Sequence, residues 1–157
     1  MKILTYLLFS TLFVSTACKS ESIQSEPEST MIEPPTSVVS IPKIQIKIGN
    51  KTFTATLVDN ATSKAFVAQL PLTINMIELN NNEKYADLPK ALPTNAAVPP
   101  SIQVGDLMLY GSRTLVLFYK GFSTSYSYTK IGKIDDITGL QAALGAGEVT
   151  VSFEVKE

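Results

Sequence analysis

The 157-residue sequence contains no histidine, no tryptophan and a single cysteine. Without histidine the chain lacks the commonest metal ligand and proton shuttle, so histidine-based catalytic triads and histidine-containing zinc sites are excluded. A single cysteine cannot form a disulfide within the chain, so a folded domain must be held by its hydrophobic core. The sequence also has no glycine-rich phosphate loop and no calcium-loop spacing. We therefore expect neither a cofactor nor a metal ion.

The chain also lacks a concentrated positive charge. Residues 19–42 hold four glutamates and one lysine, a net charge of −3, whereas residues 43–157 hold eleven basic and ten acidic side chains, a net charge of +1. Binding to a nucleic acid requires many lysines and arginines that neutralise phosphates. We therefore expect no nucleic-acid partner.

The longest apolar run, residues 3–14, is shorter than the roughly 20 residues that a membrane-spanning helix needs. Lys2 precedes the run, and the small residues Ser15, Thr16 and Ala17 separate it from Cys18. A positive start, a short apolar stretch and small residues before the cleavage point are typical of an export signal. The sequence therefore predicts a signal peptide at residues 1–17.

The stretch Val14-Ser15-Thr16-Ala17-Cys18 resembles the lipobox of bacterial lipoproteins, although Ser15 stands where that family usually has Leu, Val or Ile. The resemblance implies cleavage before Cys18, lipidation of its thiol and a partner membrane reached through the lipid anchor. It also implies a location in the bacterial cell envelope. Because Lys19 follows the cysteine, analogy with the family indicates the outer membrane in a Gram-negative cell. The alternative interpretation is an ordinary cleaved signal with an incidental cysteine.

Two further regions follow the signal. Residues 19–42 contain six serines, four glutamates and four prolines, with no glycine or aromatic residue. Such a composition buries too little apolar surface to offset the entropy of ordering the chain. Residues 18–42 are therefore predicted to be the acylated cysteine and a disordered tether, and residues 43–157 to be a single folded domain.

The domain is predicted to be mainly β, a small closed barrel of about eight strands with two short capping helices. Alternating apolar residues indicate strands, as at Ile44, Ile46 and Ile48. Helical spacing, turn residues and Pro71 delimit the helices. The predicted strands are 43–48, 52–58, 72–79, 102–110, 114–119, 130–134 and 148–155, the helices are 61–70 and 136–144, and a long connection spans 80–101.

Several segments, in this order, resemble the bacterial cyclophilin-like domain family. They cover most of residues 43–157 and comprise 46–57, 59–62, 87–89, 92–94, 105–111, 115–120, 122–129 and 131–135. The resemblance implies a cyclophilin-like β-barrel in a family whose activity is largely uncharacterised.

True cyclophilins are prolyl isomerases, with a Phe-His-Arg strand followed shortly by Phe-Met-x-Gln-Gly-Gly-Asp. Here residues 102–106 read Ile-Gln-Val-Gly-Asp, a partial match to the second motif, but Val98-Pro99-Pro100-Ser101 stands where the first would be. The usual Trp and His of the proline pocket are absent from the chain. The classical isomerase residues are thus not recognisable, and whether the protein is an enzyme stays open.

Aromatic residues interleaved with serines and threonines near residues 118–128 predict a groove for a peptide, a sugar or a small amphipathic ligand. The long connection 80–101 would form its second wall. The alternative is a pair of edge strands whose aromatics alternate between core and solvent. The candidate groove residues are Tyr85, Tyr110, Arg113, Phe118, Tyr126 and Tyr128.

The charged candidates each have a simpler interpretation. Arg113, the only arginine, suits a carboxylate or phosphate but also suits a solvated turn. Asp106 is expected to bond turn amides, and Asp135-Asp136 to cap the helix that follows. A binding module is thus the first hypothesis, a weak or atypical prolyl isomerase the second, and a structural role in an envelope complex the third.

Overall fold

The computed structural model describes residues 43–157. The predicted signal peptide at 1–17, the predicted lipidation site Cys18 and the predicted tether at 18–42 lie outside the described residues. Within residues 43–157, none of the helices has the length and hydropathy needed to span a membrane.

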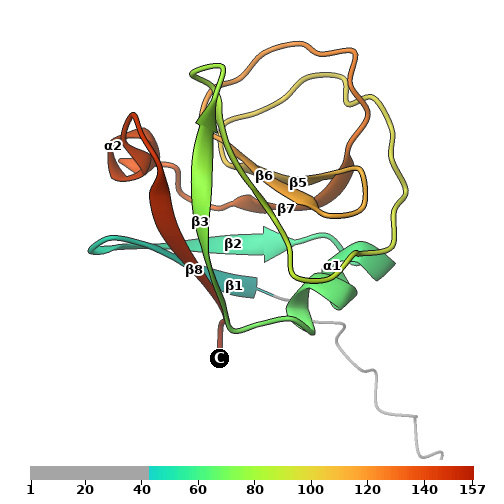
Figure 1. Ribbon diagram of the computed structural model, residues 1–157, viewed down its shortest axis with the longest axis horizontal. Coiled ribbons are helices and arrows are strands. Elements are labelled where there is room, and N and C mark those ends of the chain that lie inside the picture. The colour runs from blue at the N-terminus through green and yellow to red at the C-terminus, as the bar shows by residue number, and fades with distance from the viewer. Residues whose placement is uncertain (1–42) are drawn as a thin grey trace, which may run out of the picture. The chain divides into compact units, whose positions relative to one another are not determined.

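Eight antiparallel strands close into a barrel in the order β1-β2-β7-β5-β6-β4-β3-β8, with β8 returning to β1 (Figure 1). Two short helices, α1 and α2, complete the fold, which is the mainly β class predicted from the sequence. The elements are β1 (Lys43–Ile48), β2 (Lys51–Leu57), α1 (Ala61–Val67), β3 (Leu72–Leu79), β4 (Glu83–Asp87), β5 (Asp106–Tyr110), β6 (Thr114–Phe118), β7 (Thr129–Ile134), α2 (Leu140–Leu144) and β8 (Val149–Val155).

The alternating sequence of the first hairpin explains its structure. Ile44, Ile46 and Ile48 are fully buried, and the side chains between them are exposed or half-buried. Gly49 begins the turn with a φ of 56°, a left-handed conformation that glycine adopts without strain. The hairpin at 43–57 is therefore present as the pattern predicted.

Three predicted elements need correction. The connection 80–101 contains a complete strand, β4, which the sequence pattern did not predict because its residues are mostly polar. The strand expected at 102–110 begins only at Asp106, because a turn with Gly105 at a φ of 87° precedes it. The helix expected at 136–144 begins at Leu140. Asp136 therefore caps no helix, and its carboxylate instead accepts a hydrogen bond of 2.9 Å from the Thr138 amide.

The barrel wall has an apolar layer on both sides where β4, β5 and β6 meet. Leu115 and Leu117 of β6 point into the barrel and join the main core, whereas Val116 and Phe118 point outward into a second apolar cluster. This outward layer is covered by the segments that precede β5 and β7, which pair through the bridges Ala97–Tyr128 and Ile102–Phe122 (Figure 1). The second layer positions the candidate site.

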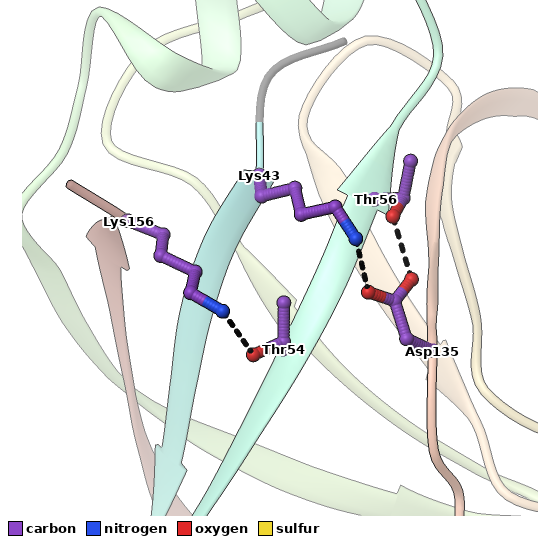
Figure 2. Close-up of polar contacts among 5 residues, drawn as sticks. All are labelled: Lys43, Thr54, Thr56, Asp135 and Lys156. Atoms are coloured by element: carbon purple, nitrogen blue, oxygen red, sulfur yellow. Dashed lines mark hydrogen bonds and ion pairs between the residues drawn. The ribbon is translucent and has the colours of Figure 1, made fainter.

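Polar contacts join the two ends of the described chain to the same side of the barrel. Figure 2 shows Lys43 of β1 donating to Asp135 at 2.8 Å, Thr56 donating to Asp135 at 2.6 Å and Lys156 reaching Thr54. Hydrogen bonds from Lys43 and Thr56 hold the pKa of Asp135 below its ordinary value. Asp135 therefore links β1, β2 and the end of β7 and is not a helix cap.

A tyrosine-lined groove as the candidate functional site

A groove of about 680 Å³ lies on the outer face of the barrel, beside the second apolar cluster. We call it the tyrosine groove. Its walls come from the turn between β3 and β4, from β4, β5 and β6, and from the segment before β7. It is lined by Leu79, Asn80, Asn82, Glu83, Tyr85, Tyr110, Thr114, Val116, Phe122, Ser123, Thr124, Ser125, Tyr126 and Tyr128.

Three tyrosines of the lining contact one another. Tyr110, the last residue of β5, is 47% exposed, Tyr126 is 62% exposed, and Tyr128 is buried. The ring centroids of Tyr110 and Tyr126 lie 6.2 Å apart with the planes at 86°, and those of Tyr110 and Tyr128 lie 5.7 Å apart at 53°. Because the rings meet at large angles, they present π faces in more than one direction.

Buried aromatic rings support these tyrosines from below. Phe118 is fully buried and packs edge to face against both Tyr128 and Phe122, with centroids 5.5 and 5.7 Å apart. Burial raises the pKa of Tyr128 to about 12, with smaller contributions from Glu83, Tyr110 and Tyr126. Tyr128 is therefore a neutral phenol at physiological pH. The floor of the groove is packed like a core, which keeps the exposed rings in place.

The β3–β4 hairpin contributes another part of the lining. Asn80 and Asn81 both have a φ of 54°, and the Asn82 amide donates to the Leu79 carbonyl across the turn. Asparagine tolerates this left-handed conformation better than most residues do. Of the connection 80–101 that was predicted as the second wall, Asn80, Asn82, Glu83 and Tyr85 line the groove, and residues 86–101 do not.

Glu83 is the functional candidate that sequence reasoning missed. It is the first residue of β4, is 7% exposed and lines the groove. Burial raises its pKa, and the negative charge of Glu78 raises it further. No hydrogen bond to its carboxyl group offsets these effects among the residues that the structure describes. An acidic group is therefore held in the groove without a partner from residues 43–157.

The next residue, Lys84, points the other way because side chains alternate along a strand. It is fully buried inside the barrel, donates to the Gly147 carbonyl and forms an ion pair with Glu78. Tyr119 donates a hydrogen bond of 2.7 Å to the same Glu78 carboxylate, and the Lys84 ammonium lies 5.8 Å from the centre of its ring. Lys84 is thus neutralised within the barrel and does not line the groove.

The structure brings four of the six predicted site residues, Tyr85, Tyr110, Tyr126 and Tyr128, to the lining of one groove and places Phe118 in the packed layer beside it. It does not bring Arg113 there.

Arg113 lies in the turn between β5 and β6, where its guanidinium donates to the Leu88 carbonyl at 2.9 and 3.3 Å and to the Pro89 carbonyl at 3.3 Å. It therefore fastens the chain after β4. Asp106 accepts from the Gln103 amide at 2.8 Å, the turn contact expected of it.

No three acidic or cysteine side chains within residues 43–157 are grouped so as to hold a metal ion. The tyrosine groove offers one carboxylate, that of Glu83, beside tyrosine phenol rings, serine and threonine hydroxyls and asparagine amides. Such a surface offers recognition by stacking, hydrogen bonding and charge.

Comparison with known proteins places this geometry in context. Residues 46–154 match the model of the family described as Cyclophilin-like family. No curated protein matches the chain. Among solved structures, the chain is similar to the solution structure of a hypothetical protein from Archaeoglobus fulgidus, with 16% identity, a TM-score of 0.48, and coverage of 73% of this chain and 95% of that one.

Proposed function

The chain belongs to the cyclophilin-like family, and from that premise we propose that residues 43–157 form a binding module for a short peptide or a small ligand. The tyrosine groove carries this proposal. Its volume of about 680 Å³ is in the range of small-molecule sites, roughly 300–1,000 Å³. Exposed tyrosine rings over a packed apolar floor supply contact area that loses little side-chain entropy on binding.

The lining favours binding over prolyl isomerisation. An isomerase of the cyclophilin type uses an arginine beside the substrate proline, but the groove lining contains no arginine. The only arginine of the chain, Arg113, is engaged with the backbone at Leu88 and Pro89. No other residue of the lining offers an equivalent fork of donors.

The first test is the replacement of Tyr126 by alanine in the full chain. A library of short peptides and small amphipathic molecules is screened by changes in intrinsic fluorescence, which arises from tyrosine because the chain has no tryptophan. Four of its six tyrosines line the groove. We expect a compound that binds the native chain to bind Tyr126→Ala about 5- to 10-fold more weakly, since a lost aromatic contact is worth about 1 kcal/mol.

Val155→Ala is the matched control, because it also truncates a half-exposed apolar residue, but on β8 and outside the groove. It should leave the affinity unchanged. Equal affinities for the native chain and Tyr126→Ala across all compounds found would contradict a binding role for the groove.

We further propose that the protein is a lipid-anchored envelope protein, with Cys18 as the acylated residue. The support is the order of features in the sequence: Lys2, the apolar run at 3–14, small residues and then the only cysteine. Two or more acyl chains would give stable membrane attachment, since one alone binds only marginally.

Replacing Cys18 by serine tests the anchor. Cells that express the native chain should hold it in the membrane fraction, released only by detergent, whereas Cys18→Ser should be recovered without detergent. Metabolic labelling with a fatty-acid analogue should mark the native chain and not the variant. Unchanged membrane association or labelling of Cys18→Ser would refute lipidation at this residue.

A further inference from the structure

We propose that the tyrosine groove recognises a compact organic cation of the alkylammonium type, with Glu83 as its counter-ion and the tyrosine rings as its walls. This inference rests on the proposed binding function and names the chemical class of the ligand. It has three supports on the described surface: the charge of the lining, the state of the Glu83 carboxyl group and the arrangement of the rings.

The lining has charge of one sign only. Glu83 is the single acidic residue among the fourteen lining residues, and none of the fourteen is lysine or arginine. The nearest cation in sequence, Lys84, lies inside the barrel in an ion pair with Glu78. A positively charged ligand would therefore meet an attractive carboxylate and no competing ammonium from the lining.

The Glu83 carboxyl group is placed to gain from such a ligand. A buried carboxylate without a partner is unfavourable unless a cation or hydrogen-bond donors compensate for its lost hydration. Glu83 is 7% exposed and has no hydrogen-bond or ion-pair partner among residues 43–157. The group borders the open groove, so a cation that enters from solvent can reach it.

The tyrosines supply the second component of cation recognition. A cation is attracted to the face of an aromatic ring within about 6 Å of its centroid. Tyr110 and Tyr126 stand almost perpendicular, at 86°, and both rings are about half exposed or more. Rings at a large angle contact a rounded group on several sides, whereas a flat guanidinium stacks best along one ring. The arrangement thus favours an alkylammonium group.

The test compares choline with its neutral carbon isostere, 3,3-dimethylbutan-1-ol, on the full chain in an uncharged maltoside detergent. The two probes have the same shape and differ in charge, so their affinities separate cation recognition from simple apolar binding. We expect tyrosine fluorescence to report choline binding at least tenfold tighter than that of the isostere.

Three variants locate the effect. Glu83→Gln should weaken choline binding about tenfold and leave the isostere unchanged, and Tyr126→Phe should bind choline more tightly than Tyr126→Leu, because phenylalanine keeps the π face. Glu157→Gln removes the same charge at the exposed end of the chain and should have no effect. Thermal unfolding of each variant verifies its fold, and the comparison of the two probes on the native chain needs no variant.

The outcomes separate this inference from the binding function. If the isostere binds as tightly as choline, or if Glu83→Gln binds choline normally, the groove binds ligands but not by their charge, and the inference is overturned. If choline does not bind at millimolar concentration, the inference is also overturned. The proposed binding function then depends on the library screen with Tyr126→Ala, which does not presuppose a cation.

Discussion

Replacing Lys84 by methionine should lower the free energy of unfolding by about 2–4 kcal/mol, a large part of the stability of a small domain. The variant keeps a long unbranched side chain, so little packing is lost. It removes the only buried cation among residues 43–157. The Gly147 carbonyl loses its donor, and Glu78, whose side chain is only 19% exposed, keeps the Tyr119 hydroxyl as its remaining side-chain partner. A largely buried carboxylate without a counter-charge is strongly unfavourable.

Urea unfolding of Lys84→Met, Glu78→Gln and the double variant measures this coupling. The double variant should be about 1–2 kcal/mol more stable than the sum of the single effects predicts, because it leaves no unpaired charge. Additive single effects would mean that Lys84 and Glu78 do not stabilise one another.

The loss of stability in Lys84→Met should also depend on pH. Burial tends to raise the pKa of Glu78, but hydrogen bonds from Lys84 and Tyr119 outweigh it and hold the pKa below its ordinary value. A lowered folded-state pKa contributes stability above the unfolded value, near 4.3, that is lost as the pH falls through the folded value. Without Lys84 the pKa of Glu78 rises, so the stability difference between native chain and variant should shrink as the pH falls from neutral to below about 4.3, through the lowered folded-state pKa of the native chain. A difference independent of pH would contradict this assignment.

Gly132→Ala should lower the free energy of unfolding by about 2–3 kcal/mol, although it adds a single methyl group. Gly132 lies in β7 opposite Leu57, and a Cβ atom there would stand 2.6 Å from the Thr56 carbonyl oxygen and 3.1 Å from the Leu57 Cα. These are backbone atoms, which cannot turn aside as a side chain can. The methyl group must push β2 away from β7, where residues 55–57 pair with residues 132–134. Backbone hydrogen bonds from Val58 to Ile131 and from Asp135 to Thr54 continue this contact on both sides.

Gly147→Ala is the matched control for this change. A Cβ at Gly147 meets nothing within 4 Å, and its φ lies outside the left-handed region. Alanine there should leave stability unchanged or raise it by about 0.4–1 kcal/mol through the unfolded chain. Urea unfolding of both variants makes the comparison, and equal stabilities would show that β2 and β7 adjust freely at Gly132.

The limits of sequence reasoning are clearest at β4. Strands with alternating apolar residues, such as β1 and β8, were predicted almost to the residue. The sequence of β4, Glu-Lys-Tyr-Ala-Asp, has no clear apolar alternation, because one of its two inward positions holds Lys84 and the other the small residue Ala86. Glu78 lies opposite Lys84 in the same hairpin, but Gly147 and Tyr119, which complete the surroundings of the Lys84 ammonium group, come from distant parts of the chain. No local sequence pattern predicts these long-range contacts.

At the candidate site, too, local sequence patterns predicted some residues and missed those that depend on tertiary contacts. The tyrosines of the 118–128 region could be predicted because aromatic and hydroxyl residues gather within a few positions. Glu83 could not, because its importance depends on burial beside side chains more than 25 residues away in sequence. Arg113 was grouped with the tyrosines by its place in the chain, but its side chain reaches the backbone after β4.

Closure of the barrel also determines how a peptide can be recognised. Within residues 43–157 each of the eight strands has a neighbour on both sides, so no strand presents a free row of amide and carbonyl groups. Binding by strand addition, in which a peptide extends a sheet and is held by main-chain bonds of any sequence, is therefore unavailable to the barrel. A partner must be selected through its side chains, and the barrel offers no template for edge-to-edge aggregation.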